Sequence, residues 1–85
     1  MGNRRHEMEI LMSILRITMR EARVTHIMYR ANLSYSSLRK YLSEALNMGL
    51  IVKDYNGDGL PIYRITEKGR SLLEKLEEVE KFMQR

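Results

Sequence analysis

Polar and cationic side chains that could bind an anion follow one another closely in the middle of the chain. They comprise a phenol, three hydroxyls, a guanidinium and an ammonium group: Tyr35, Ser36, Ser37, Arg39, Lys40 and Ser43. The planar fork of Arg39 can donate two hydrogen bonds to O6 and N7 of guanine, and serine hydroxyls can bind phosphates or bases. This set predicts contact with DNA, although the same residues also suit the solvent-facing side of an amphipathic helix.

A second group of candidate DNA-binding residues flanks a predicted β-hairpin. Lys53, Tyr55 and Arg64 belong to it, and we expect Lys53 and Arg64 to lie on neighbouring strands facing phosphate. Contacts of this kind position a protein on a duplex more than they specify a sequence. Asp54 and Asp58 lie in the same hairpin and would repel phosphate, which leaves the contribution of the hairpin open.

A third group of candidates lies near the two ends of a predicted short helix. It consists of Arg23, His26 and Arg30. Arg23 and Arg30 are candidates for phosphate contacts, whereas His26 is either such a contact or a simple surface residue. The other histidine is His6, and no spacing in the chain matches a set of metal ligands, so neither a metal nor another cofactor is expected.

The positive charge of the chain is unevenly distributed. Residues 1–65 contain ten Lys or Arg and six Asp or Glu, whereas residues 66–85 contain five of each, so the net charge of +4 falls on the first part. This asymmetry favours an anionic partner for residues 1–65 and a different role for the tail. An ordinary solvated surface would also account for so small an excess.

Length and composition narrow the class of protein. With 85 residues, the chain is expected to form one domain whose core is thin enough to benefit from a partner subunit. It contains no Cys, which excludes disulfides and thiolate metal sites. No apolar stretch approaches the roughly 20 residues that span a bilayer, and charges interrupt the N-terminus where a signal peptide would lie. We therefore expect a cytoplasmic protein without membrane contact.

The elements that would position these side chains begin with two helices. Apolar residues at spacings of three and four predict an amphipathic helix from about residue 4 to residue 21. Val24 is expected to form a one-residue bridge or short strand. Thr25 is expected to be the N-cap of a short helix from residue 26 to about residue 31.

The third predicted helix carries the first group of candidates. Asn32 favours the backbone angles of a turn, and Ser34 can cap the helix that follows, from about residue 35 to residue 48. Gly49 stands where a residue in the left-handed conformation is expected to end it. Its apolar positions define a core face, and the polar candidates lie on the opposite face.

A β-hairpin is predicted next. Residues 50–55 are rich in β-branched side chains and form its first strand, and residues 62–65 form the second. The segment 56–59 is a strong reversal signal because its Asn-Gly pair supports positive φ angles. Pro61 is expected just outside the returning strand, where its missing N–H does no harm.

The last predicted helix begins after Thr66 and runs to near Gln84. Its apolar residues form a stripe wider than a strict heptad seam, and they are Leu72, Leu73, Leu76, Val79, Phe82 and Met83. A wide stripe predicts two neighbours, namely the first helix of the same chain and a second subunit. Packing of all six residues inside one chain is the alternative, but an 85-residue monomer would struggle to cover them, so we expect a homodimer.

The predicted order is helix, helix, turn, helix, hairpin, helix, which defines a winged helix-turn-helix. The fold class is therefore α+β, mainly α, with a two-stranded wing. One domain covers residues 1–85, with a DNA-binding body at 1–65 and a dimerisation helix at 66–85. In this fold the helix at 35–48 would enter the major groove, and the helix before it would cross the DNA backbone.

Two stretches of the chain also resemble archaeal winged-helix DNA-binding proteins that dimerise through a C-terminal helix. They are Asn32-Leu33-Ser34 with Leu38, Tyr41-Leu42, Leu46 and Gly49-Leu50-Ile51, and the run Tyr63-Arg64-Ile65-Thr66-Glu67-Lys68-Gly69. The resemblance covers nearly the whole chain. It implies a DNA-binding function, either as a transcription regulator or as a chromatin-like protein. The final helix is short for a long coiled coil.

The sequence therefore predicts a homodimeric, sequence-specific regulator that binds double-stranded DNA. An architectural protein with little sequence preference is an alternative, and so is a winged helix that binds other proteins. An enzyme is the least expected class, because the chain has neither a glycine-rich phosphate loop nor a clustered acid–base pair.

Overall fold

The computed structural model describes residues 4–84, with side chains from His6 onward. It contains four helices and one two-stranded sheet: α1 (Arg4–Ile17), α2 (Val24–Ala31), α3 (Tyr35–Asn47), β1 (Ile51–Tyr55), β2 (Pro61–Ile65) and α4 (Glu67–Met83). This order confirms the predicted winged helix-turn-helix, mainly helical with an antiparallel wing.

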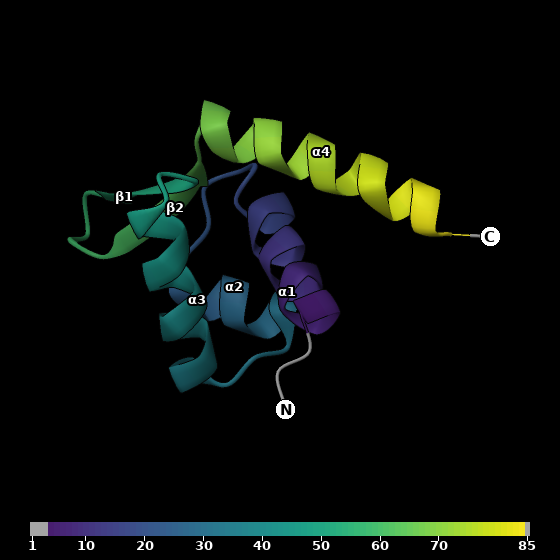
Figure 1. The fold of residues 1–85 in the computed structure, drawn as a ribbon. Coiled ribbons are helices and arrows are strands. Elements are labelled where there is room, and N and C mark those ends of the chain that lie inside the picture. The colour runs from purple at the N-terminus through teal and green to yellow at the C-terminus, as the bar shows by residue number, and fades with distance from the viewer. Residues whose placement is uncertain (1–3, 85) are drawn as a thin grey trace.

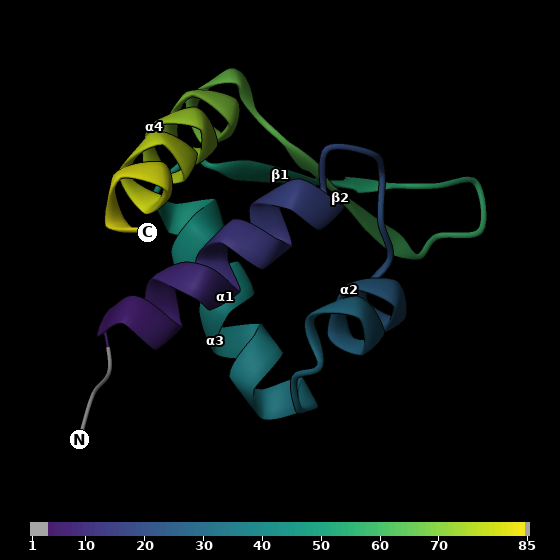
Figure 2. The same ribbon diagram turned by 90° about the vertical axis from the view of Figure 1, so that its right-hand side faces the viewer.

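Helices α1, α2 and α3 are grouped together in the body of the molecule (Figure 1), and their buried side chains form one apolar core. The core centres on Ile14, Leu15, Ile27 and Leu38, which are almost completely buried. The hairpin extends from the body on the side of α3, and α4 passes over α1 and projects beyond it. The tip of the hairpin and the free end of α4 lie on opposite sides of the body (Figure 2).

Helix α1 ends four residues earlier than predicted, at Ile17 rather than residue 21. The hydroxyl of the buried Thr18 donates to the carbonyl of Ile14 over 2.8 Å. The carbonyl of Thr18 in turn accepts a hydrogen bond from the N–H of Ile65, also over 2.8 Å. In a longer helix, the Thr18 carbonyl would accept a hydrogen bond from a later N–H of the same helix. Because it accepts from the strand residue Ile65 instead, the helix ends there.

The segment between α1 and α2 also differs from its prediction. Ala22, not Val24, forms the bridge, and it pairs antiparallel with Tyr63. Helix α2 begins at Val24, and the residue in the N-cap position is Arg23, whose side chain makes no capping hydrogen bond. The predicted N-cap at Thr25 is therefore wrong. The extended backbone ends at Ala22, which pairs with β2, so the helix can begin two residues later, at Val24.

The ends of α2 and α3 follow the predicted turn chemistry. Asn32 has a φ of 55° and Gly49 a φ of 75°, so both adopt the left-handed conformation. After each helix, two successive N–H groups bind carbonyls of its last turn, as in a Schellman motif. Ser34 is the N-cap of α3, as expected, and its hydroxyl accepts from the N–H of Ser37 over 3.2 Å.

The strands are shifted slightly from their predicted bounds. β1 begins at Ile51 rather than at Leu50, because the N–H of Leu50 closes the end of α3. β2 begins at Pro61, which pairs with Tyr55 instead of lying outside the strand. Proline is compatible with the first position of a strand because no ladder hydrogen bond is needed there.

The reversal between the strands occurs where predicted, but a different residue carries the positive φ. That residue is Gly59, with a φ of 79°, and neither residue of the Asn56-Gly57 pair has one. The N–H of Gly59 donates to the carbonyl of Asn56 over 2.9 Å. The wing thus has a longer loop than the two-residue turn that an Asn-Gly pair favours.

Thr66 caps α4 as predicted, and its hydroxyl accepts from the N–H of Gly69 over 3.0 Å. The helix runs to Met83, and Gln84 stands in the C-cap position. Between residues 4 and 84, no helix is both long enough and apolar enough to cross a membrane.

Candidate nucleic-acid interface

The outward face of α3 is polar and cationic. Its inward face buries Leu38, Leu42 and Ala45 in the core. Arg39 and Lys40 are exposed, and neither forms an ion pair with any side chain that the structure describes. The Lys40 ammonium lies 5.9 Å from the ring centre of Tyr41. Two cations without ion-pair partners can neutralise an anionic partner without first breaking a salt bridge.

The structure separates the six predicted residues of this helix into two kinds. Tyr35, Ser36, Arg39, Lys40 and Ser43 are exposed. Ser37 is half-buried, its hydroxyl accepts from the hydroxyl of Ser34 over 3.1 Å, and its N–H binds the same oxygen. Ser37 therefore belongs to the helix cap. The hydroxyl of Ser36 also lies 3.3 Å from that of Ser34 but is exposed, and the other four residues remain available to a partner.

Two further exposed residues of α3 were not among the predicted contacts. Asn47 lies seven residues after Lys40 and is exposed on the same side of the helix, so the helical period already contained this signal. Glu44 is exposed four residues after Lys40 and introduces a carboxylate near the cationic face. Its charge would oppose phosphate at that end of the helix.

A groove of about 400 Å³ separates α3 from the wing and the start of α2. It is lined by Val24, Tyr35, Leu38, Arg39, Leu42, Ser43, Leu46, Lys53, Pro61 and Tyr63. Most of these side chains are apolar, and the two cations come from different elements, Arg39 from α3 and Lys53 from β1. The groove can therefore attract an anion but contains no acid–base pair or nucleophile arrangement suited to catalysis.

The wing presents different charges on its two faces. Lys53 pairs with Tyr63 in the strand register, and Arg64 pairs with Val52. Directly opposed residues share a face and neighbouring residues alternate, so Lys53 and Arg64 lie on opposite faces of the hairpin. The two residues are on neighbouring strands, as predicted, but not on one face, and contact of either with phosphate stays a prediction. Lys53 is on the face of α3, where its ammonium lies 5.7 Å from the ring centre of Tyr55.

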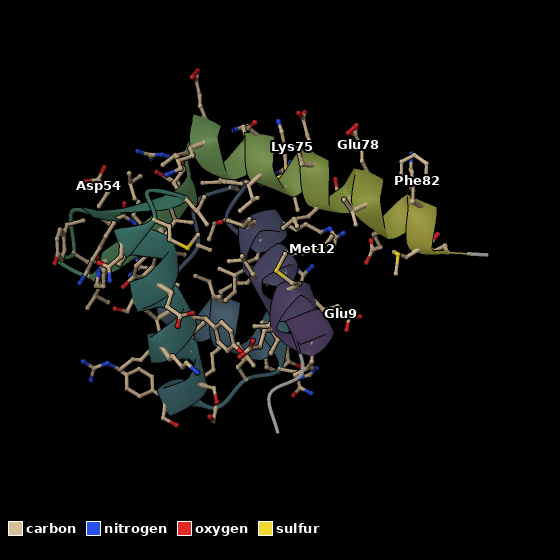
Figure 3. The ribbon with its side chains drawn as sticks, in the orientation of Figure 1. Glu9, Met12, Asp54, Lys75, Glu78 and Phe82 are labelled. Atoms are coloured by element: carbon tan, nitrogen blue, oxygen red, sulfur yellow. The ribbon has the colours of Figure 1, made fainter. Side chains whose placement is uncertain are left out.

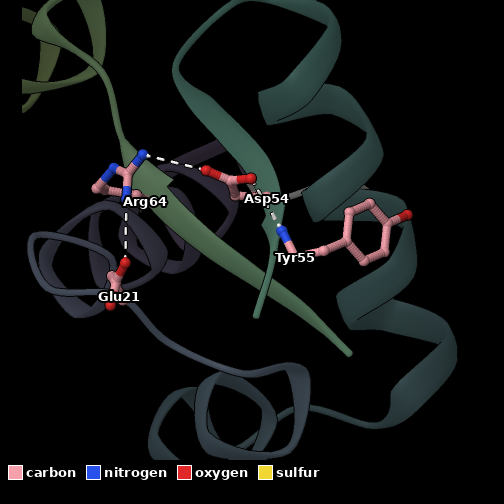
Figure 4. A network of polar contacts seen from close by, with 4 residues as sticks. All are labelled: Glu21, Asp54, Tyr55 and Arg64. Atoms are coloured by element: carbon pink, nitrogen blue, oxygen red, sulfur yellow. Dashed lines mark hydrogen bonds and ion pairs between the residues drawn. The ribbon is translucent and has the colours of Figure 1, made fainter. Parts of the chain in front are cut away.

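Arg64 is held by two carboxylates on the other face of the wing. Its guanidinium lies 3.1 Å from Glu21 and 3.6 Å from Asp54, as Figure 4 shows. The ring of Tyr55 points away from this cluster. Because all three charged side chains are at least partly exposed, water and salt weaken these pairs. Arg64 nevertheless has less free charge to offer phosphate than Lys53.

Arg23 is also paired, and its partner is in the wing loop. Its guanidinium lies 2.6 Å from a carboxylate oxygen of Asp58. The backbone N–H of Leu60 and the Arg23 guanidinium hold the pKa of the Asp58 carboxyl below its usual value. This contact ties the tip of the wing to the start of α2. Arg30 and His26 are exposed on α2.

The described residues include no group of three potential metal ligands placed together. The two histidines lie on different helices, His6 on α1 and His26 on α2.

Helix α4 divides its apolar residues between the body and solvent. Leu73 is buried in the core of the same chain, and Leu72 and Leu76 are half-buried. Beyond them exposure rises, to 56% at Val79 and 69% at Met83.

The free end of α4 has an apolar surface that its own chain leaves uncovered. Phe82 is 90% exposed and points away from the body near that end (Figure 3). Arg16 holds the middle of the helix to α1 through Glu77 at 2.9 Å and Glu80 at 3.6 Å. The last turns of the helix extend past α1.

A helix-turn-helix followed by a two-stranded wing is the fold of winged-helix DNA-binding proteins and transcription regulators. The sequence profile of the winged helix-turn-helix family matches residues 4–84. The chain belongs to this family.

A known protein is also similar to this chain in sequence. An uncharacterized protein of Methanocaldococcus jannaschii, MJ0290, is 39% identical over 77 residues, which cover 89% of this chain and 34% of that protein. The chain thus spans about a third of the length of that relative.

Among solved structures, Sso10a-2, a DNA-binding protein from Sulfolobus solfataricus, is similar with a TM-score of 0.81 and 34% identity, over 89% of this chain and 79% of that one. The transcriptional regulator BldR from the same organism has a TM-score of 0.81 at 22% identity, over 88% of this chain and 56% of that one. The second likeness shows the shared fold alone.

Proposed function

We propose that this chain is a sequence-specific regulator of transcription that binds double-stranded DNA as a homodimer, with α3 in the major groove. The observation that carries the proposal is the outward face of α3, where Arg39 and Lys40 are exposed without ion-pair partners among the described residues. The similarity to Sso10a-2, which is described as a DNA-binding protein, supports it. A binding role is typical of this family, so we propose no enzymatic activity.

Within this proposal the residues divide by role. Arg39 donates to a guanine edge, and Tyr35, Ser36, Lys40 and Ser43 contact bases or phosphates beside it. Such contacts need exposed side chains, and all five are exposed.

Residues outside α3 would position the duplex. Lys53 and Tyr55 contact the backbone from the near face of the wing, and Arg30 contacts it from α2. Arg23 and Arg64 are already bound to carboxylates, so we assign them chiefly to the position of the wing.

The proposed dimer uses the apolar stripe of α4. Leu72, Leu76, Val79 and Met83 follow spacings of four, three and four, which bring them to one side of the helix. Phe82 widens this surface, and Leu73 does not belong to it because it is buried in its own chain. A second copy of the same stripe would remove these side chains from water, and burial of an apolar side chain is worth about 1.5–3 kcal/mol.

The proposal is tested by selecting bound duplexes from a random DNA library and comparing Arg39→Ala with the unchanged chain. We expect one enriched sequence, and a loss of about 1–3 kcal/mol of discrimination at one base pair in the variant. Arg70→Ala is the matched control, because Arg70 is an exposed cation on α4. It should leave the sequence preference unchanged.

The remaining outcomes distinguish the alternatives. An equal loss of affinity on every sequence would make Arg39 a phosphate contact. A ratio of specific to random affinity near one at fixed salt would indicate an architectural DNA-binding protein. No detectable binding of any duplex at moderate salt would overturn the proposal in favour of a protein-binding module.

A further inference from the structure

The end of α3 and the start of α4 are connected by direct hydrogen bonds, although they are separated by the whole wing. The hydroxyl of Thr66 donates to the carbonyl of Gly49 over 2.6 Å. The N–H of Thr66 donates to the carbonyl of Leu50 over 3.0 Å. Gly49 and Leu50 are the two residues that close α3. One residue before α4 therefore binds both carbonyls directly after α3.

The Thr66 hydroxyl does more than cap a helix. An N-cap needs only to accept a hydrogen bond, and Thr66 does so from the N–H of Gly69 over 3.0 Å. The same oxygen also donates its proton to Gly49. A single hydroxyl thus joins the first turn of α4 to Gly49, in the turn that follows α3.

Close backbone packing supports this connection. At Gly69, a Cβ atom would overlap the carbonyl oxygen of Leu50 and lie 2.7 Å from a side-chain carbon of Ile65. The first turn of α4 therefore rests on backbone, which cannot move aside as a flexible side chain can. We call Gly49, Leu50, Thr66 and Gly69 the α3–α4 joint.

We infer that Thr66 is a positioning residue that sets the angle between α3 and α4, and through it the preferred spacing of DNA half-sites. This inference rests on the proposed function, because it needs a dimer joined by α4 that binds DNA through α3. In such a dimer, each recognition helix is located relative to the two-fold axis through its own α3–α4 joint.

The length of α4 makes the angle important. Its 17 residues extend about 25 Å at 1.5 Å per residue. A rotation of roughly 10° at the joint would move the far end of such a helix by about 4 Å, more than the roughly 3.4 Å that one base pair adds along the axis of a DNA duplex. Small changes at the joint therefore shift the register in which two α3 helices meet one duplex.

A second polar connection between α4 and the body, among the described residues, is weaker. Arg16 reaches Glu77 and Glu80, but these side chains are between 41% and 45% exposed. Exposed ion pairs contribute little and are screened by salt. At the joint, the N–H of Thr66 keeps its bond to Leu50 in any variant, so the short hydroxyl contact is the polar restraint that a side-chain substitution removes.

Three substitutions separate the two functions of Thr66. Thr66→Ser keeps both hydrogen bonds of the hydroxyl. Thr66→Asp can accept from Gly69 but cannot donate to Gly49, so it keeps the cap and loses the connection to α3. Thr66→Val loses both. If Thr66 only caps α4, Thr66→Asp should behave like Thr66→Ser in the measurements below. If Thr66 positions α4, Thr66→Asp should behave like Thr66→Val.

The first measurement follows the angle between α3 and α4 through a distance between two spin labels. Cysteines introduced as Asn47→Cys on α3 and Glu78→Cys on α4 would carry two spin labels, since the natural chain contains no Cys. The labelled chain is diluted with excess unlabelled chain, so that distances within one chain dominate. We expect one narrow distance for Thr66 and Thr66→Ser, and a shifted or broader distribution for Thr66→Asp and Thr66→Val.

The second measurement determines which separation of two DNA half-sites the protein prefers. The half-site selected from random DNA is placed twice in duplexes that differ only in the separation of the copies. The unchanged chain and Thr66→Ser should prefer one spacing. In Thr66→Asp and Thr66→Val, the preference over a spacing one base pair longer should fall roughly fivefold, the equilibrium factor of one neutral hydrogen bond.

A stability control accompanies both measurements. Ile14→Val removes one carbon from a completely buried side chain and should lower stability without changing either readout. Identical label distances in all four chains, or a change in Ile14→Val equal to that in Thr66→Val, would overturn the inference. Failure to enrich any sequence would overturn the proposed function and the spacing role with it, and the label distances would still decide whether Thr66 sets the angle.

Discussion

Helices α3 and α4 are both amphipathic, yet they expose opposite kinds of surface. α3 buries Leu38, Leu42 and Ala45 and exposes hydroxyls and cations. α4 buries Leu73 but leaves Val79 and Phe82 largely uncovered. Water can solvate the polar outer face of α3 well. The apolar side chains at the free end of α4 are unfavourably exposed to water, and an apolar partner would cover them. The difference indicates two separate surfaces, one for an anion and one for another apolar surface.

Charge follows the same division. α3 carries Arg39 and Lys40 against the single carboxylate of Glu44. α4 carries five carboxylates and four cations, and residues 66–85 as a whole have no net charge. Repulsion between two tails is therefore small, whereas the body keeps the net positive charge that favours DNA.

The largest expected effect comes from a charge placed on the stripe of α4. Val79→Glu should leave the monomer folded, because Val79 is 56% exposed in the single chain. In a dimer it would bury a carboxylate without a partner, so the dimer should dissociate and DNA affinity should fall about 100-fold or more through lost bivalency. Analytical ultracentrifugation and a DNA titration would measure the two effects.

The control for this substitution is Ser71→Glu, which adds the same charge at an exposed position of α4 away from the stripe. It should leave both the dimer and DNA binding intact. If Val79→Glu remains dimeric, the apolar end of α4 is not the dimer surface and the proposed contrast between the two helices fails.

A smaller effect tests which wing cation belongs with the α3 face. Lys53→Ala should reduce the slope of log affinity against log salt concentration by about one, because one phosphate contact is lost. Arg64→Ala should leave that slope nearly unchanged, since Arg64 lies on the other face with Glu21 and Asp54. Each variant serves as the charge-matched control of the other. Equal slopes in the two would place both faces of the wing against DNA.

The smallest effect concerns the ion pair between the wing loop and α2. The pKa of Asp58 is below its usual value of 3.8 in the folded chain, so the unfolded chain binds more protons at acidic pH. Its stabilising contribution should be complete above about pH 4 and disappear as the pH falls through the lowered pKa. Asp58→Asn should flatten this part of a plot of melting temperature against pH. Parallel curves for the two proteins would contradict it.

Much of the fold was predictable because its signals are local. Ser34 and Thr66 cap the helices that follow them, and Asn32 and Gly49 adopt the left-handed conformation that ends the preceding ones. Each of these depends on residues within a few positions. The exposed face of α3 was equally predictable, because the helical period alone separates its polar side from Leu38 and Leu42.

The errors arose where distant segments meet. α1 ends early because Thr18 binds Ile65, and α2 begins early because Ala22 pairs with Tyr63. Arg23 binds Asp58, 35 residues away in the chain, and Arg64 binds Glu21, 43 residues away, so composition could not show that these charges are already paired. Contact of the two arginines with DNA stays a prediction.

The sequence by itself determined the order of the elements, the caps, the polar face of α3 and the apolar stripe of α4, because periodicity and turn chemistry act over a few residues. Tertiary structure decided which cations are free, which face of the wing accompanies α3 and how α4 is set against it. Those outcomes depend on strand register and on contacts such as that of Thr66 with Gly49, 17 residues apart, which exist only after the chain has folded.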